Sequence, residues 1–149
     1  MSMSQLLFSF SGRLNRKPYW LTTLCLILVF LVIITLIFVV GGAGILSGDM
    51  SGLGVLLIVI VLLYIPLLWV GLALGAKRLH DRNKSGWWLL LFWFVPMILQ
   101  GAGEQIDGIG IVLTLAGLGI SIWGLVEIGF LRGTVGPNQY GPDPLEGPR

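Results

Sequence analysis

The stretch KRLHDRNKSGWW, residues 77–88, is a dense polar segment between two long apolar runs, and it decides how the chain is arranged. It contains four of the nine Lys and Arg residues, the single histidine and one aspartate. Its last two residues are tryptophans, which favour the boundary between lipid and water. We therefore expect a loop on one face of a membrane, with apolar helices entering the bilayer on both sides of it.

The composition excludes an ordinary water-soluble domain. Hydrophobic residues make up 56% of the 149-residue chain and charged residues only 11%. So few polar residues would not cover the surface of a soluble domain of this size. The formal net charge of +2 is too small to indicate nucleic acid as a partner. The length corresponds to one domain.

Four apolar segments are predicted to cross the membrane as helices. The first carries no charge and would be about 33 Å long, enough for a hydrocarbon core of about 30 Å. The second contains Pro66, whose missing N–H predicts a kink, and continues as a helix through residues 77–82. The predicted spans are residues 19–40, 53–76, 86–103 and 109–131, with a glycine-rich loop at residues 41–52.

The third segment is the shortest of the four. Its uninterrupted apolar part, residues 87–99, would be about 20 Å long as a helix. Ser85 is the expected N-cap of this helix. Adding Gly86 and residues 100–103 makes the segment long enough to span. A re-entrant segment is the alternative.

The distribution of positive charge favours four spans over three. With four spans, all nine Lys and Arg residues lie on one side, and the charged residues of the two opposite loops are Asp49, Glu104 and Asp107. Cytoplasmic loops are enriched in Lys and Arg, whereas a re-entrant third segment would place Arg132 and the tail outside. The predicted fold is therefore an all-α membrane protein, a four-helix transmembrane bundle with both termini cytoplasmic.

Both ends of the chain lie outside the predicted spans. Near the N-terminus, apolar residues have the spacing of a short amphipathic helix, while residues 8–11 alternate as in a strand. An amphipathic piece here would lie at the membrane interface. Residues 133–149 are rich in Gly and Pro, so they form either docked turns or a disordered tail. The chain thus divides into a membrane domain, residues 1–132, and a cytoplasmic tail, residues 133–149.

Three segments taken together point to a known family: GRLNRKPYW (residues 12–20), KRLHDRNKSGWWLL (residues 77–90) and GTVGPNQYGPDP (residues 133–144). They resemble the bacterial inner-membrane proteins grouped as domain-of-unknown-function family 805. The resemblance implies a small multi-pass protein of the bacterial inner membrane, and it implies no particular activity. The acidic loop before the fourth span and Glu127 depart from the family pattern.

Polar residues near the cytoplasmic face form the candidate binding site. Guanidinium groups bind phosphate through paired hydrogen bonds, and the cytoplasmic leaflet carries anionic lipids, so we expect an anionic headgroup or a partner protein as ligand. The simpler interpretation is that these bases only fix the membrane orientation. Asp81 favours a built site, because it can pair with Lys77 or Arg78 along the helix or orient Arg13. The candidates are Arg13, Arg16, Arg78, His80, Asp81, Arg82, Lys84, Asn138 and Tyr140.

Two polar residues inside predicted spans suggest an alternative function. Glu127 and Gln100 would line a path in a small oligomeric transporter or channel-like protein, since intramembrane acids are costly and often functional. Glu127 is equally suited to pairing with Arg132 or with a base of residues 77–84. Small residues four apart favour close helix packing within the chain, in a homo-oligomer or against a membrane protein partner. These pairs are Gly71 with Gly75 and Gly117 with Ser121.

The sequence contains no catalytic constellation, and we predict a protein that is not an enzyme. It has neither a phosphate-binding glycine loop nor a nucleophile motif. His80 has no second His or Cys at metal-ligand spacing, so neither a metal nor a cofactor is expected. As the single cysteine, Cys25 cannot form an internal disulfide, and within its apolar run it is expected to be a small packing residue.

Overall fold

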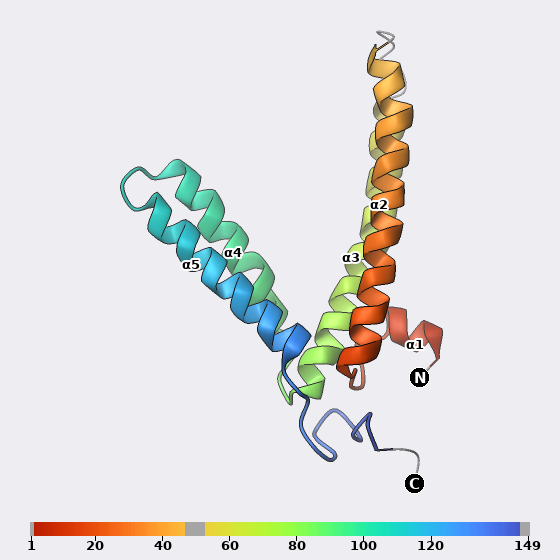
Figure 1. Cartoon of the computed structure of the whole chain (residues 1–149), viewed down its shortest axis with the longest axis vertical. Helices are drawn as coiled ribbons and strands as arrows, with labels where there is room; N and C mark the ends of the chain where they lie inside the picture. Colours follow the sequence, from red (N-terminus) through yellow and green to blue (C-terminus); the bar gives the residue numbers. More distant parts are fainter. Residues whose placement is uncertain (1, 47–52, 147–149) are drawn as a thin grey trace. The chain divides into compact units, whose positions relative to one another are not determined.

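The computed structural model describes residues 2–46 and 53–146, and every regular element in that part of the chain is a helix (Figure 1). The all-α prediction is therefore confirmed. The predicted loop at residues 41–52 is wrong in its first half, because no proline or charge interrupts residues 41–46 and the helix continues through them. The rest of that loop lies outside the described residues. The elements are α1 (Met3–Phe8), α2 (Arg16–Leu46), α3 (Leu53–Asp81), α4 (Trp88–Gln105), α5 (Gly110–Leu125) and the π-helix η1 (Val126–Phe130), which continues α5.

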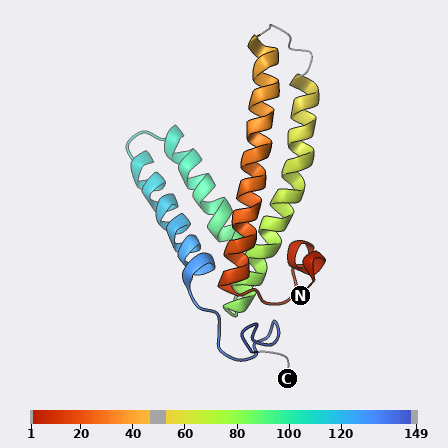
Figure 2. The ribbon, with the colours of Figure 1, turned by 45° about the vertical axis from the view of Figure 1, so that its right-hand side comes forward.

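The chain forms two compact units. The arm, Trp20–Gly71, contains most of α2 and of α3, which run antiparallel to each other (Figure 2). The body, Met1–Tyr19 with Leu72–Arg149, combines α1, the first turn of α2, the end of α3, both later helices and the tail. All of the interactions of the candidate site lie within the body.

Three helical segments are long and apolar enough to cross a membrane, namely Arg16–Val39, Ile58–Asp81 and Gly110–Phe130. They correspond to the first, second and fourth predicted spans. The third predicted span is α4, which has 18 residues and includes Glu104 in its last turn. It is not among the three candidate spans that the described residues contain.

The arm presents apolar side chains outward. On α2, Leu28 and Phe38 are exposed, which suits contact with lipid rather than with water. Cys25 is also exposed, so the packing role expected for it is wrong; the adjacent Leu24 is exposed as well. Pro66 lies inside α3, and the helix continues through it from Leu53 to Asp81.

In the body, α4 and α5 pack against each other as an antiparallel hairpin (Figure 1). Buried glycines of α5 allow this close approach. A Cβ added at Gly117 would lie 3.1 Å from the carbonyl oxygen of Pro96, and one added at Gly124 would lie 2.8 Å from Cγ of Phe92. Both distances are shorter than an ordinary van der Waals contact, so the hairpin depends on residues without side chains at these positions.

The core of the body lies where α3, α4 and η1 meet. Leu79, Leu89, Phe92 and Ile128 are buried there. Gly75 of α3 brings the two helices together, since a Cβ at this position would lie 2.8 Å from Cδ2 of Leu89. This core fixes the end of α3 against α4 and η1, and so positions the charged residues that follow.

A tight turn joins α3 to α4. α3 ends at Asp81, one residue before the predicted limit at residue 82, and Asn83 then adopts a left-handed φ of 57°. The prediction of Ser85 as N-cap is wrong, because the turn continues to Trp87, which occupies the cap position in a helical conformation. The Ser85 hydroxyl oxygen instead accepts a hydrogen bond from the Trp87 N–H at 3.4 Å.

The glycine contacts of the hairpin give a stability prediction. We expect Gly124→Ala to lower the free energy of unfolding by about 1–3 kcal/mol, because the added methyl group overlaps Phe92 close to its backbone. Gly119→Ala on the same helix is the matched control, because a Cβ there has nothing within 4 Å. Thermal unfolding in detergent measures both variants. Equal loss of stability in the two would contradict the close packing described for Gly124.

Candidate functional site

Three segments of the body, residues 12–16, 77–84 and 132–143, converge into one polar assembly, here called the cap. The middle segment comes from the last turns of α3 and the turn that follows. The first segment leads into α2, and the last is the part of the tail that follows η1. The cap therefore brings together the three sequence motifs of the chain.

Asp81 is the centre of the cap. Its Oδ1 accepts a hydrogen bond from Nε of Arg13 at 3.0 Å and forms an ion pair with Nη2 of the same arginine, also at 3.0 Å. Its Oδ2 accepts a hydrogen bond from Nη1 of Arg78 at 2.6 Å. The three side chains are 3% exposed or less. Both contacts expected for Asp81 with an arginine therefore form, and they form simultaneously. Removing the carboxylate or a guanidinium group from such a buried cluster strongly destabilises the protein, because it leaves a buried charge without its partner.

The remaining N–H groups of the two buried arginines hold backbone carbonyl groups. Arg13 donates to the carbonyl oxygens of Thr134 and Gly136 at 2.6 Å each and to that of Gly141 at 3.3 Å. Arg78 donates to the carbonyl oxygens of Ile128, at 2.8 Å, and Leu131. The N–H groups of Arg13 thus face four acceptor atoms, which are Oδ1 of Asp81 and three carbonyl oxygens of the tail. Its positive charge is used to fold the tail and leaves no donor for an external anion.

The tail is docked by further contacts around His80. The side-chain amide of Asn138 donates to the carbonyl oxygen of His80 at 2.9 Å. The ring of Tyr140 stacks on the imidazole of His80, with the ring centroids 3.9 Å apart and the ring planes 3° from parallel. On the other side of the loop, Nδ1 of His80 lies 3.2 Å from the carbonyl oxygen of Gly12. Of the two alternatives for the tail, docked turns are the ones observed, over the described residues up to 146.

Asp143 closes the docked tail on itself. Its carboxylate accepts hydrogen bonds from the N–H groups of Leu145, at 2.9 Å, and Gly136, at 3.0 Å. These backbone N–H groups, together with the positive charge of Arg13, hold the pKa of Asp143 below its ordinary value of 3.8. Sequence reasoning did not identify Asp143. Asp is a common turn residue because its side chain bonds nearby backbone N–H groups, so its place in a Gly-Pro-rich segment could have indicated this role.

Glu127 forms a second charged cluster at the edge of the cap. It lies in η1, is 3% exposed, and its Oε1 accepts hydrogen bonds from Arg82 Nε at 2.6 Å and Lys84 Nζ at 2.8 Å. Lys84 also lies over the ring of Trp88, 4.9 Å from its centroid. Of the partners predicted for Glu127, the bases of residues 77–84 are the observed ones. Arg132 contributes its carbonyl oxygen, which accepts from Arg82 at 2.8 Å.

Lys77 makes a contact that the sequence did not predict. Its ammonium group donates to the carbonyl oxygens of Gln5, at 2.9 Å, and Leu6, and does not make the predicted pair with Asp81. Lys77 therefore faces α1, where the carbonyl oxygen of Gln5 also accepts a hydrogen bond from the N–H of Ser9. The side chain is fully buried. Lys77 therefore ties the N-terminal helix to the cap.

The other predicted residues lie away from these two clusters. Arg16 is exposed and donates to the carbonyl oxygen of Phe130 at 3.0 Å. Gln100 is exposed on α4, and Ser121 is half-buried on α5. Gly71 belongs to the arm. Within residues 2–46 and 53–146, no group of three or more His, Cys, Asp and Glu side chains is arranged to hold a metal ion.

A family model described as "Protein of unknown function (DUF805)" matches residues 7–142. The chain is 32% identical to the uncharacterized protein YiiR of Escherichia coli, over 96% of this chain and 90% of that protein. It is also 32% identical to the inner membrane protein YhaI of the same species, over 93% of this chain and 87% of YhaI. The inner membrane protein YhaH is 31% identical, over 91% of this chain and 86% of YhaH. No solved structure matches the chain.

The buried position of Asp81 gives a second prediction. We expect Asp81→Ala to lower the free energy of unfolding by about 3–5 kcal/mol, because it leaves the guanidinium groups of Arg13 and Arg78 buried without their carboxylate. Cleavage of the tail by a protease should become faster in parallel. Asp107→Ala, at an exposed residue of the α4–α5 turn, is the control. If both variants unfold and are cleaved like the unchanged protein, Asp81 does not organise the cap.

The lowered pKa of Asp143 gives a pH prediction. Because the folded-state pKa lies below 3.8, the ionised carboxylate stabilises docking at every pH above that value. The stabilisation is lost as the pH falls below 3.8 and through the folded-state pKa. A dye attached to a Leu145→Cys variant in a Cys25→Ser background reports release of the tail as a fall in fluorescence anisotropy. In Asp143→Asn this acid transition should be absent, whereas an unchanged transition would assign it to another group.

Proposed function

The chain belongs to the DUF805 family, and on that premise we propose that it is a non-enzymatic integral protein of the bacterial inner membrane whose basic cytoplasmic face binds anionic phospholipid headgroups. Two relatives are named inner membrane proteins, which supports the location. The three apolar helical segments support an integral rather than a peripheral protein. The headgroup assignment rests on which bases have exposed side chains.

The proposed topology has four spans with both termini cytoplasmic. α4 would be about 27 Å long at 1.5 Å per residue, close to the thickness of a hydrocarbon core. It runs along α5, with Gly103 of α4 beside Gly110 at one end and Phe92 beside Gly124 towards the other. A membrane crossing by Gly110–Phe130 would therefore carry α4 across with it. All nine Lys and Arg residues then lie on the cytoplasmic side.

The single observation that carries the lipid assignment is that some of the Lys and Arg side chains are buried and others are exposed. Arg13 and Arg78 are buried and hold Asp81 and the tail, so we assign them a structural role. Arg16, Lys17 and Arg132 are exposed at the start of α2 and just after η1. Arg16 also donates to the carbonyl oxygen of Phe130, so these two helix ends lie together. Three exposed bases at one place suit an anionic membrane surface.

Aromatic residues support the same position for the membrane boundary. Trp87 is 77% exposed at the start of α4. Indole rings favour the headgroup region, where one part of the ring is apolar and its N–H is hydrated. Lys84, three residues earlier, contacts the ring of Trp88. The turn between α3 and α4 therefore fits the level of the lipid headgroups.

The transporter alternative has less support. It depends on Glu127 as a group that binds a proton or cation in the membrane. The Oε1 atom of Glu127 already accepts from Arg82 and Lys84, an arrangement that favours a structural ion cluster. Gln100, the other residue of that hypothesis, is on α4 and has no part in the cluster.

The lipid assignment predicts a change in bound lipid. An Arg16→Gln/Lys17→Gln/Arg132→Gln variant should retain less phosphatidylglycerol relative to phosphatidylethanolamine than the unchanged protein. At about 1 kcal/mol per base near an anionic surface, the enrichment should fall by up to about 100-fold. Native mass spectrometry of protein released from nanodiscs of both lipids measures this ratio.

The matched control exchanges the charged groups without removing charge: Arg16→Lys, Lys17→Arg and Arg132→Lys together. This control should keep most of the enrichment, because the attraction is largely between charges. Equal enrichment in all three proteins would exclude these bases as the headgroup site. If the glutamine variant instead loses one co-purifying protein and keeps its lipids, the basic face binds a partner protein.

A further inference from the structure

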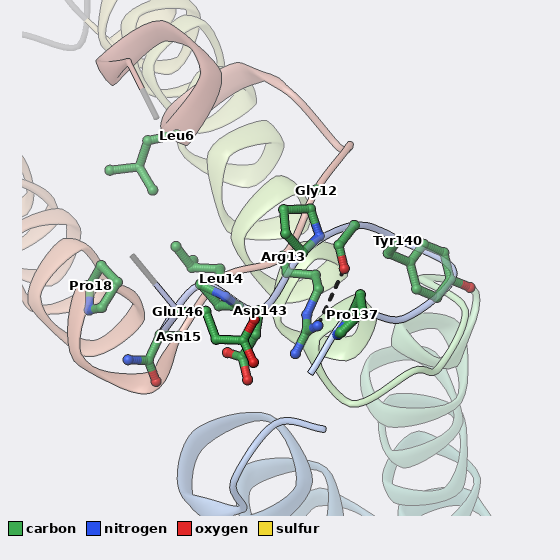
Figure 3. A pocket seen from close by; sticks show the side chains of 13 residues that line it. Leu6, Gly12, Arg13, Leu14, Asn15, Pro18, Pro137, Tyr140, Asp143 and Glu146 are labelled. Atoms are coloured by element: carbon green, nitrogen blue, oxygen red, sulfur yellow. Dashed lines mark hydrogen bonds between the residues drawn. The ribbon is translucent and has the colours of Figure 1, made fainter. Parts of the chain in front are cut away.

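A pocket of about 900 Å³ opens within the body between the N-terminal segment and the docked tail (Figure 3). This volume is within the range that small-molecule sites occupy, about 300–1,000 Å³. Most of its wall is apolar. Leucines and a proline line the N-terminal side, and three prolines line the tail side. These residues are Leu6, Leu14, Pro18, Pro137, Pro142 and Pro144.

The N-terminal side of the pocket includes part of the apolar face of α1. Met3, Leu6 and Leu7 have the i, i+3, i+4 spacing that places side chains on one side of a helix. Leu6 lines the pocket, and no residue of α1 is fully buried, so the body covers this face only in part. The helix is nevertheless held in place by its capping box and by the ammonium group of Lys77. An apolar molecule in the pocket would bury the uncovered part of this face and gain the corresponding hydrophobic free energy.

The charged groups of the wall are engaged within the protein. The guanidinium group of Arg13 faces Asp81 and three carbonyl oxygens of the tail. Asp143 accepts hydrogen bonds from two backbone N–H groups, and Glu146 also has an interaction of its own. A cation would therefore compete with partners that these acids already have. An anion would be repelled by both carboxylates and would find no unused guanidinium N–H, so the wall favours a neutral ligand.

Asn15 is the polar group of the wall that has hydrogen-bond donors to offer. Its Oδ1 accepts a hydrogen bond from the N–H of Arg16 at 2.6 Å, which fixes the orientation of the amide. The amide nitrogen carries two N–H donors, and these have no partner in the part of the chain that the structure describes. The side chain is half-buried at the pocket. It is therefore suited to donate to a neutral acceptor, such as the carbonyl oxygen of an ester.

We propose that the pocket binds a neutral acyl ester, with its apolar chain against Leu6 and Pro18 and its carbonyl oxygen accepting a hydrogen bond from the side-chain N–H of Asn15. Two sources supply the same chemistry. One is an acyl chain of a membrane glycerolipid with its ester group, and the other is a small acyl ester in the cytoplasm. This site differs from the proposed headgroup site, because it recognises a neutral group and uses none of the exposed bases.

The position of the pocket makes the lipid source physically accessible. Asn15 directly precedes α2, and Pro18 lies in the first turn of that helix, where the candidate membrane span Arg16–Val39 begins. The start of a membrane span is the level at which headgroups lie, and the ester groups of a glycerolipid lie between its headgroup and its chains. A small ester would reach the same pocket from the aqueous side, so the test separates the two sources.

The test uses full-length protein in phosphatidylcholine nanodiscs and two photoreactive probes. The first probe is a fatty-acid methyl ester with a diazirine at the end of its chain, and the second is a phosphatidylcholine that carries the same acyl chain. After irradiation, mass spectrometry identifies the crosslinked residues. We expect crosslinks within residues 6–18 and 137–144, which surround the pocket. Methyl octanoate should displace the probe from these residues more effectively than octanoate at equal concentration in the membrane.

The first variant fills the pocket. Leu6→Trp places a larger side chain in the wall, so we expect crosslinking at the pocket to fall at least about fivefold. Met3→Trp is the matched control on the same helix, because Met3 is 69% exposed and is not part of the wall. It should leave crosslinking at the pocket unchanged. Thermal unfolding of both variants checks that the fold is preserved.

The second variant removes the donors of Asn15 and does not depend on a change of size. Asn15→Asp keeps the side-chain oxygen that accepts from the N–H of Arg16 and replaces the amide N–H groups. We expect methyl octanoate to displace the probe about two- to tenfold less effectively, which corresponds to the loss of one hydrogen bond. Displacement by n-octane, which has no acceptor, should stay the same.

Each result has a defined meaning. Pocket crosslinks from the lipid probe, with the expected effects of both variants, support the site with a membrane lipid as ligand. Pocket crosslinks from the methyl ester alone, with the same effects, support it with a small ester as ligand. Crosslinks confined to residues outside the pocket, equal losses in Leu6→Trp and Met3→Trp, octanoate displacing as well as methyl octanoate, or no effect of Asn15→Asp overturns the proposal. The proposed function is tested on other residues, Arg16, Lys17 and Arg132, so either proposal can fail alone.

Discussion

The buried contact of Asp81 with Arg13 and Arg78 is the constraint on which the cap depends. One carboxylate faces guanidinium groups that come from two different segments of the chain. The remaining N–H groups of those arginines then select the backbone carbonyl groups of the tail and of the residues around the end of η1. Because a buried charge requires a partner, the three segments can only be buried together.

This arrangement changes how positive charge in the sequence is interpreted. The positive-inside rule treats every cytoplasmic Lys and Arg alike. In this chain, Arg13, Lys77 and Arg78 are almost fully buried and make internal hydrogen bonds, whereas Arg16 and Lys17 are exposed. Lys77 and Arg78 donate to carbonyl groups near the ends of α1 and η1, whereas Arg13 donates to carbonyl groups of the tail. Bases near helix ends are therefore candidates for internal bonding before they are candidates for ligand binding.

Hydrophobic patterning was sufficient to predict the helices and most of their limits. The end of the second helix, the pairing of Arg78 with Asp81 three residues later, and the apolar character of three spans all follow from local sequence. Other features depend on tertiary contacts. Lys77 turns to the carbonyl groups of α1, and Gly86, next to Ser85, packs closely against Ala76 of α3. Neither contact can be predicted from the few residues on either side of it in the sequence.

The tail illustrates the same limit. Its glycines and prolines excluded a regular helix or strand, but they left docking and disorder equally open. Docking follows from acceptors on its backbone, and backbone carbonyl groups are present in every sequence. Gly133 is an exception with a specific reason, because any side chain at this position would overlap the carboxylate of Asp81. The side chains of Asn138 and Tyr140 then determine how the tail lies on His80.

The distance in sequence between the parts of the cap has a consequence for biosynthesis. Arg13 leaves the ribosome well before its acceptors at Thr134, Gly136 and Gly141, which follow it by more than 120 residues. The cap can therefore close only after the helices between them have been synthesised. A chain that stops before residue 132 lacks the carbonyl groups that Arg13 holds in the folded cap. Closure of the cap thus requires that synthesis has passed residue 141.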